Sequence, residues 1–216
     1  MISKRLEEKF NYHKSDKNND MWYHFDMLRG IAVDSNIIME LGTRGIVSTW
    51  AFLAGMGQKQ ERVIQITEDR KKLITQPSQA LWSYDINHPK EYGANVEEVE
   101  EIAEENDIQW KFIQEDTLKV DLPPCDAIFF DTDHTYKQLS QELKLHGNKA
   151  RKYLVFHDTT KFATELVPAI NEFLEENEEW HILSSRNECH GITVLVKATI
   201  EKIDKWLNDE IKKGEL

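Results

Sequence analysis

Short apolar segments alternate with amphipathic segments along the chain from residue 37 onward, and this alternation constrains the fold more than any other feature. In the amphipathic segment 95–108, Val96, Val99, Ile102 and Ala103 recur at the spacing of one helix face. Continuous apolar strands that alternate with helices indicate a mostly parallel sheet buried on both faces. We therefore predict an α/β, Rossmann-like, doubly wound fold with helices on both faces. The seven strands are predicted at 36–41, 80–86, 110–116, 126–131, 152–158, 180–185 and 191–197.

The last two apolar segments are joined by only RNECH, residues 186–190. This connection is too short for a helical crossover, so the sheet is predicted to end in a C-terminal antiparallel hairpin. Residues 58–79 interrupt the regular alternation. They either extend the helix predicted at 47–56 or contain an additional short strand at 62–67.

The 216 residues are most simply one folded domain with two terminal additions. Residues 1–36 precede the alternation and are predicted to form an N-terminal cap or lid, with a short amphipathic helix at 21–34. Residues 37–199 carry the sheet, and 200–216 are predicted to form a C-terminal helix. The aromatic side chains Trp22, Tyr23 and Phe25 either stack on a bound ring or pack the cap helix.

The net charge of −12 argues against a nucleic-acid partner, because phosphate backbones attract basic surfaces. Two cysteines, Cys125 and Cys189, are too few for a disulfide framework and indicate a reducing compartment. No apolar run has transmembrane length, and the charged beginning MISKRLEEKF contains no signal-peptide core. We expect a cytoplasmic protein with no membrane partner.

The segment MELGTRGIVSTW places Glu40, Gly42 and Gly45 between a predicted strand and a predicted helix. Glycines there allow a tight turn and a close ligand approach, and the helix start offers free N–H groups. The two glycines fill the second and third positions of a dinucleotide fingerprint, but Glu40 occupies the first. A carboxylate suits a positively charged ligand, such as the ammonium and sulfonium of S-adenosylmethionine, better than a pyrophosphate. An ordinary strand–helix turn is the alternative.

The next strand ends bring further acids to the same edge of the sheet. Asp85 follows the apolar run ALWSY and is the expected partner of ribose hydroxyls, with a plain loop aspartate as the alternative. Glu68 or Asp69 would take this role if 62–67 were the second strand. Glu115 and Asp116 end the third strand, where they either flank an adenine or form a solvated turn.

Two later strand ends, FFDTDH and LVFHD, carry the strongest chemical signal. Because their strands are predicted to be neighbours, Asp131, His134, His157 and Asp158 should meet at one rim, together with Asp133. Carboxylates from neighbouring strands form an oxygen-rich site for a divalent cation such as Mg²⁺. An imidazole beside that site could act as general base toward a substrate hydroxyl.

With these motifs in order, residues 37–197 resemble the class I S-adenosylmethionine-dependent methyltransferases. The closer resemblance is to metal-dependent small-molecule and sugar O-methyltransferases, of the cephalosporin hydroxylase-like and macrolide sugar O-methyltransferase-like types. The segments that carry it are ELGTRGIVSTW, WSYDIN, FFDTDHTYKQLSQEL and VFHD. The resemblance implies S-adenosylmethionine as cofactor, a divalent metal (Mg²⁺ or Mn²⁺), and O-methylation of a small-molecule hydroxyl, with a sugar among the candidates.

The resemblance also implies roles for individual residues, with His134 as the general base. Cofactor-binding residues are expected to be Glu40, Gly42, Thr43, Gly45, Ser48, Asp85, Glu115, Asp116 and Asp131. Metal ligands are expected to be Asp131, His157 and Asp158. The sequence departs from the family at His157, where relatives with a metal site often carry an acid. An imidazole there would shift the preference from Mg²⁺ toward Mn²⁺ or another transition metal.

Two other functions compete with this interpretation. A nucleotide-dependent oxidoreductase could use the same sheet, although Glu40 at the first glycine position argues against it. A non-catalytic, methyltransferase-like binding module is the second alternative, and the intact Asp131, His134 and Asp158 argue against it. The sequence leaves the oligomeric state open, with a homo-oligomer among the options.

Overall fold

The computed structural model describes residues 2–70 and 79–198, so the C-terminal helix predicted at 200–216 lies outside the described residues. One sheet runs through the molecule, with strands in the order β3-β2-β1-β4-β5-β7-β6. Its strands are β1 (Ile37–Leu41), β2 (Gln79–Asp85), β3 (Ile108–Gln114), β4 (Cys125–Phe130), β5 (Ala150–His157), β6 (Trp180–Arg186) and β7 (Ile192–Lys197).

The pairing of the strands confirms the predicted sheet. β1 to β5 run parallel to one another, whereas β7 is antiparallel to both β5 and β6. The five residues between β6 and β7 permit only this hairpin. Because β1 to β5 are parallel, their carboxyl ends all meet at one edge, where ligands bind in open parallel sheets.

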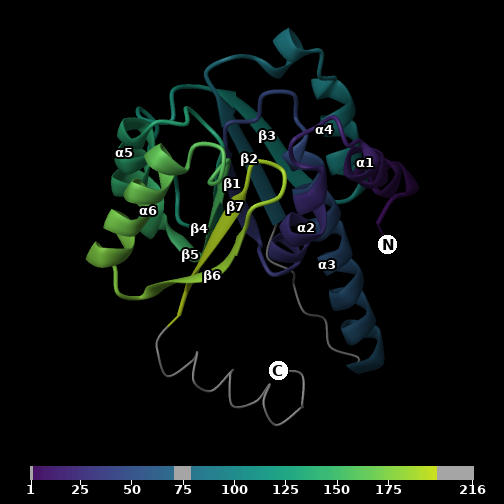
Figure 1. Ribbon diagram of the computed structural model, residues 1–216. Helices are drawn as coiled ribbons and strands as arrows, with labels where there is room; N and C mark the ends of the chain where they lie inside the picture. The colour runs from purple at the N-terminus through teal and green to yellow at the C-terminus, as the bar shows by residue number, and fades with distance from the viewer. Residues whose placement is uncertain (1, 71–78, 199–216) are drawn as a thin grey trace.

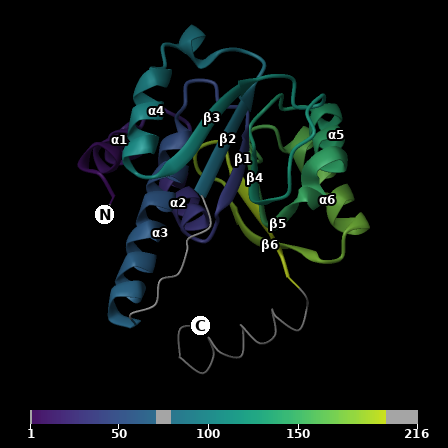
Figure 2. The same ribbon diagram turned by 180° about the vertical axis from the view of Figure 1, so that it is seen from behind.

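Helices cover both faces of the sheet, as predicted (Figure 1). α5 and α6 lie on one side and α1 to α4 on the other, and the view from behind shows the same two layers (Figure 2). The helices are α1 (Lys4–Ser15), α2 (Phe25–Val33), α3 (Ser48–Arg70), α4 (Val96–Glu105), α5 (Tyr136–His146) and α6 (Ala163–Glu176). Short 3₁₀ turns, η1 (Trp22–His24), η2 (Pro89–Tyr92) and η3 (Gly147–Lys149), complete the connections.

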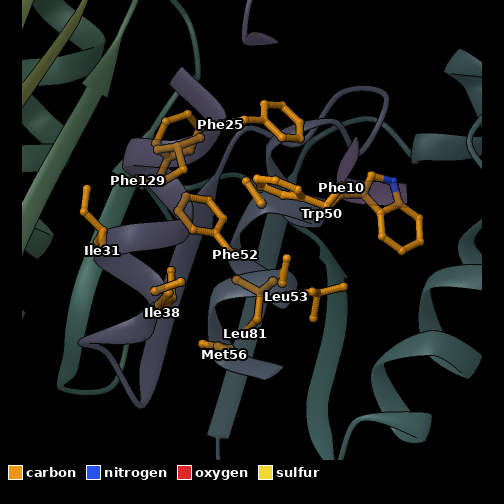
Figure 3. Packing of buried hydrophobic residues seen from close by; sticks show 14 of the residues in the cluster. Phe10, Phe25, Ile31, Ile38, Trp50, Phe52, Leu53, Met56, Leu81 and Phe129 are labelled. Atoms are coloured by element: carbon orange, nitrogen blue, oxygen red, sulfur yellow. The ribbon is translucent and has the colours of Figure 1, made fainter. Parts of the chain in front are cut away.

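The side chains of β4 show how the apolar strands build two cores. Successive residues of a strand point to opposite faces, so Ala127 and Phe129 join the core under α1 to α4, while Ile128 and Phe130 join the core under α5 and α6. Figure 3 shows the first core, in which Phe129 packs near Phe52. Every residue of β4 is buried, which explains the apolar run from Ala127 to Phe130.

Helix α3 decides between the two alternatives left open by the sequence, a longer helix or an additional strand at 62–67. It runs from Ser48 to Arg70, so the preceding helix is extended and 62–67 does not form a strand. Glu68 and Asp69 therefore lie within a helix and follow no strand. Asp85, at the end of β2, keeps the position expected of a ribose-binding acid.

The N-terminal segment contains a helix that the sequence did not predict. α1 is charged over most of its surface and buries only Leu6 and Phe10. Phe10 packs against Phe25 of α2, with ring centroids 5.5 Å apart. Within the described ranges 2–70 and 79–198, no helix is both long and apolar enough to cross a membrane.

Candidate active site

An open cavity of about 1120 Å³ lies at the carboxyl edge of the sheet. It is lined by the loops that follow β1, β2, β3 and β4, by Asp158 after β5, and by residues 18–21 before η1. Its volume is at the upper end of small-molecule sites, which span roughly 300–1,000 Å³. The predicted residues that line it are Gly42, Thr43, Gly45, Ser48, Asp85, Asp116, Asp131, His134 and Asp158. Glu40, Glu115 and His157 are not part of this lining.

The loop between β1 and α3 forms one wall. Gly42 adopts φ +85°, and a Cβ at this position would lie 2.0 Å from the backbone oxygen of Asp131. Only glycine therefore allows the two loops to pack this closely. Arg44 and Ile46 also have positive φ, which is unfavourable for a β-branched side chain such as isoleucine. The loop is held in a conformation that its own sequence does not favour.

Hydrogen bonds to Asp85 help to hold the loop between β1 and α3 in this conformation. Its Oδ2 accepts hydrogen bonds from the backbone N–H of Thr43 at 3.0 Å and of Arg44 at 2.9 Å. Its Oδ1 accepts a bond from the N–H of Asn87 at 3.0 Å. A carboxylate has about four lone-pair sites, so Asp85 can still accept one bond from a ligand hydroxyl.

The hydrogen-bond partners of Glu40 in the structure are hydroxyl groups of the protein, whereas the sequence predicts contact with a cofactor. Its side chain is fully buried, and it accepts hydrogen bonds from the hydroxyls of Ser48, Thr49 and Ser83 at 2.6, 2.8 and 2.6 Å. Burial raises the pKa of Glu40 to about 7, although these hydroxyl bonds favour the ionised form. Glu40 thus ties the start of α3 to β2 beneath the loop, and direct contact with a cofactor stays a prediction.

The far wall contains apolar side chains that the sequence analysis missed. Ile86 and Tyr92 follow β2, Leu118 follows β3, and all three line the cavity. Ile86 is 63% exposed although it directly follows a buried strand. The signal in the sequence is an apolar residue, Ile86, immediately after the strand-end acid Asp85. Asp116 lines this wall, while the neighbouring Glu115 does not.

On the opposite side, Asp131, His134 and Asp158 come together as predicted. The Nε2 of His134 lies 2.7 Å from Asp158 Oδ2 and 3.3 Å from Asp131 Oδ1. The His134 ring stacks on Phe162, with centroids 4.5 Å apart and an interplanar angle of 3°. Two carboxylates and one aromatic ring therefore fix the orientation of this imidazole. Among the described residues, none forms a hydrogen bond with its Nδ1.

His157 lies directly behind this group and is almost completely buried. Its Nδ1 is 3.2 Å from Asp131 Oδ1 and 3.7 Å from Asp158 Oδ2. Its Nε2 faces the backbone oxygens of Asp20 and Cys189, both at 3.2 Å. His157 thus connects Asp131 with the N-terminal segment and with the loop between β6 and β7.

His190 is a further residue that the sequence analysis did not select. Its Nδ1 lies 3.0 Å from Asp158 Oδ1 and 3.6 Å from Asp20 Oδ2. It stands in the connection RNECHG, which the hairpin brings over the end of β5. No sequence spacing relates His190 to Asp158, because only the antiparallel pairing of β5 with β7 places them together.

The charges of this cluster set its protonation. Burial alone would lower the pKa of His134 and of His157, but hydrogen bonds and attraction to the two carboxylates raise both values to about 9. Burial would raise the pKa of Asp131, yet the hydrogen bonds from both imidazoles lower it to about 2. Without another cation, the two aspartates are therefore ionised and the two histidines protonated near neutral pH.

The donor atoms fit a divalent cation. Asp131, His134 and Asp158 each offer one ligand atom, and these atoms lie within 4.8 Å of one another. Two carboxylate oxygens suit Mg²⁺ or Mn²⁺, and an imidazole nitrogen shifts the preference toward Mn²⁺. His157 presents Nδ1 to the same oxygens while Nε2 faces backbone carbonyls, which is a frequent arrangement of metal-bound histidines.

Comparison with solved structures identifies the architecture. A methyltransferase from Podospora anserina with bound S-adenosylhomocysteine superposes with a TM-score of 0.56 at 13% identity, covering 92% of this chain and 89% of that one. The O-methyltransferase TomG from Streptomyces achromogenes, in complex with S-adenosylmethionine, gives 0.53 at 14% identity and covers 92% of each chain. The chain has a methyltransferase fold.

An O-methyltransferase from Bacillus cereus in complex with S-adenosylhomocysteine shares this methyltransferase fold, with a TM-score of 0.50, 15% identity, and coverage of 90% of this chain and 91% of that one. No protein-family model matches the chain, and no curated protein matches it either. The likeness therefore rests on the methyltransferase fold, which confirms the predicted architecture.

Proposed function

We propose that this protein is an S-adenosylmethionine-dependent O-methyltransferase that methylates a hydroxyl group of a small molecule. The observation that carries the proposal is one continuous cavity that joins the glycine loop and Asp85 on one side to Asp131, His134 and Asp158 on the other. A methyl donor and a group that accepts a hydroxyl proton would thus meet in a single space. The fold that this chain shares with known O-methyltransferases supports the same conclusion.

The cofactor would occupy the wall formed by the loops after β1, β2 and β3. Asp85 has one acceptor site left for a ribose hydroxyl after its three backbone bonds. Ile86 and Leu118 would flank the adenine, and Asp116 is available to its amino group. S-adenosylmethionine, when bound, supplies an electrophilic methyl group on a sulfonium.

In the transfer, a bond forms between the acceptor oxygen and the methyl carbon while the carbon–sulfur bond breaks. The hydroxyl proton must leave, and His134 is the group positioned to take it. Its Nε2 faces Asp131 and Asp158, so Nδ1 is the nitrogen that would take the proton. The imidazole must be neutral for this step, and a cation held by the two carboxylates would lower the pKa of His134 from about 9 toward that state. Stacking on Phe162 limits rotation of the imidazole ring, so Nδ1 keeps a fixed direction. Fixing the two reactants and the base in one geometry contributes much of the rate.

A divalent metal would be held by Asp131 and Asp158, with nitrogen ligation from His157 Nδ1, so that His134 stays available as the base. When bound, it would supply Lewis-acid stabilisation of negative charge on the acceptor oxygen. The paired carboxylates already attract two protonated imidazoles, so the site is built for positive charge. Asp131 is thus proposed both to contact the cofactor and to ligate the metal.

The charge of the cavity limits the acceptor. Six aspartates line it, and Arg44 is the only lysine or arginine among the described lining residues. Phosphate-bearing acceptors would be repelled by this lining. A neutral molecule with several hydroxyl groups, such as a sugar, meets no such repulsion and finds many hydrogen-bond acceptors.

The strand order of the sheet also argues against the alternative function, a nucleotide-dependent oxidoreductase. Dinucleotide-binding sheets have the order 3-2-1-4-5-6, whereas here the antiparallel β7 is inserted between β5 and β6. This insertion, together with Glu40 beneath the glycine loop, favours the methyl donor over a pyrophosphate-containing cofactor. Turnover separates the proposed enzyme from a non-catalytic binding module.

The test uses His134→Ala with His181→Ala as the matched control, because His181 lies on β6 and its Nε2 is 3.1 Å from the backbone oxygen of Ala198, away from the cavity lining. Methyl transfer from labelled S-adenosylmethionine to a panel of sugars and phenols is measured with Mn²⁺ present. We expect His134→Ala to lose at least about 100-fold in turnover and to bind S-adenosylhomocysteine as wild type does. Full activity of His134→Ala would remove His134 as the base, and wild-type failure on every acceptor would favour the binding module.

A further inference from the structure

Helix α5 contains a fully buried carboxylate that the proposed reaction does not use. Glu142 has no exposed surface and does not line the cavity. It accepts hydrogen bonds from the hydroxyl of Thr117 at 2.5 Å, from the hydroxyl of Thr132 at 2.8 Å and from the amide of Gln138 at 3.0 Å. All three of these partners do line the cavity. A single hidden carboxylate therefore holds three residues of the cavity wall.

The partners of Glu142 belong to segments that the sheet itself does not join. Thr117 follows β3 and Thr132 follows β4, and these strands are separated in the sheet by β2 and β1. No strand pairing therefore fixes one loop relative to the other. The Thr117 loop receives a second anchor from α5, because the Nε2 of the buried His146 lies 2.7 Å from its backbone oxygen.

Burying a carboxylate here is costly for stability alone. Burial raises the pKa of Glu142 even though three donors favour its ionised form. Well-packed apolar side chains often stabilise a core as much as buried charged groups do or more. A carboxylate is better explained by geometry, since its two oxygens can hold two different loops at once.

We infer that Glu142 is a positioning residue that couples the cofactor wall to the reaction centre. Through Thr117 it fixes the loop of Asp116 and Leu118, and through Thr132 it fixes the loop of Asp131 and His134. The first loop is where we propose that adenine binds, and the second carries the proposed base, so this inference rests on the proposed function. Loss of Glu142 would let the two loops move independently.

The chain offers a matched control at the opposite end of the sheet. Asp126, at the start of β4, is also buried, and its Oδ2 accepts bonds from the backbone N–H of Asn36 at 2.7 Å and of Ile37 at 3.3 Å. Glu142→Gln and Asp126→Asn each replace a buried, hydrogen-bonded carboxylate by an amide. Only the first faces the cavity loops.

Two measurements on the full-length variants test the inference. Amide hydrogen exchange without any ligand reports on residues 115–118 and 131–134, and calorimetry gives the dissociation constant of S-adenosylhomocysteine. We expect Glu142→Gln to speed exchange in both loops and to weaken binding about tenfold. Asp126→Asn should change neither, although it lowers the melting temperature. Thr132→Val, which removes a single hydroxyl, replaces Glu142→Gln if that variant does not fold.

The possible outcomes distinguish the positioning role of Glu142 from the proposed methyltransferase function. Unchanged exchange in both loops of Glu142→Gln, or the same acceleration in Asp126→Asn, would overturn the positioning role. Selective loosening of the loops in a protein whose wild type binds no S-adenosylhomocysteine would support that role and overturn the proposed function. Selective loosening together with weakened binding supports both.

Discussion

Two pairs of carboxylates lie close to the cavity, and they have opposite surroundings. Glu40 and Glu142 are fully buried and accept their hydrogen bonds from hydroxyl and amide groups. Asp131 and Asp158 face imidazoles, which carry positive charge when protonated. Burial dominates for the glutamates and raises their pKa values, whereas the imidazoles lower the pKa values of the aspartates despite burial.

This difference distinguishes carboxylates that hold the structure together from carboxylates that can bind a cation. Uncharged donors hold Glu40 and Glu142, and both side chains are fully buried, so in the described structure these residues hold loops together. The aspartates are balanced by side chains that can lose their protons, so a cation can take over the same oxygens. We therefore expect cation binding to depend directly on Asp131 and Asp158, whereas Glu40 and Glu142 act through the structure that they hold together.

The largest expected effect comes from Gly42, which lies where the two regions meet. In Gly42→Ala the new Cβ would overlap the backbone oxygen of Asp131, at 2.0 Å, and the residue would keep a φ of +85°. We expect a loss of about 4 kcal/mol or more in unfolding free energy and no measurable cofactor binding. Urea denaturation and calorimetry measure the two effects.

Gly45→Ala is the matched control in the same loop, because a Cβ there meets no atom within 4 Å. We expect a change of less than about 1 kcal/mol for this variant. Equal losses in the two variants would show that the loop is generally intolerant of substitution. The close approach of Gly42 to Asp131 would then not be the cause.

The second prediction concerns the pH dependence contributed by Glu40. Its pKa is raised from 4.5 in the reference state to about 7 in the folded protein, so folding favours its protonated form. Its contribution is fully present below about pH 4.5 and is lost as the pH rises to about 7. Relative to Glu40→Gln, the wild type should lose on the order of 3 kcal/mol over this interval. Denaturation curves of both proteins between pH 4.5 and 8 test this, and parallel stability profiles would contradict it.

The smallest expected effect, and the most specific, comes from Asp131→Asn. Removing one charged ligand should weaken Mn²⁺ binding by roughly 10- to 100-fold. Because the ionised Asp131 pairs with His134 and His157, the unfolding free energy in EDTA should also fall, by about 2 kcal/mol at neutral pH. Titration with Mn²⁺ followed by electron paramagnetic resonance gives the affinity. Asp133→Asn removes the same charge from the same loop, but among the described residues Asp133 is hydrogen-bonded only to the Thr135 hydroxyl. Equal weakening by both variants would indicate general attraction to the acidic cavity instead of ligation.

Much of the fold could be read from the sequence, because the central strands are largely apolar and the connections have lengths that permit few alternatives. All seven predicted strands are present, and the short connection at 186–190 predicted the hairpin. α1 was missed because only Leu6 and Phe10 are buried along it, which gives a weak helical pattern. The extent of α3 also remained undecided, since 58–70 fits a helix or a strand equally well.

The site was predictable where it depends on strand order and unpredictable where it depends on loops. Asp131 and Asp158 end adjacent parallel strands, so their meeting follows from the sheet. The direction of Glu40 depends on hydroxyls from β2 and α3, and no spacing in the sequence reveals them. His190 and the segment 18–21 reach the cavity only through tertiary packing.

Calorimetric titration of S-adenosylhomocysteine into the wild-type protein, with Mn²⁺ and then with EDTA, is the direct test of cofactor binding. We expect one site per chain with a micromolar dissociation constant, which corresponds to about −8 kcal/mol. Binding in both conditions, with a separate heat of Mn²⁺ binding that disappears in Asp131→Asn, would support the cofactor wall and the metal site independently. Absence of binding at millimolar ligand would contradict the methyltransferase function and leave only the fold.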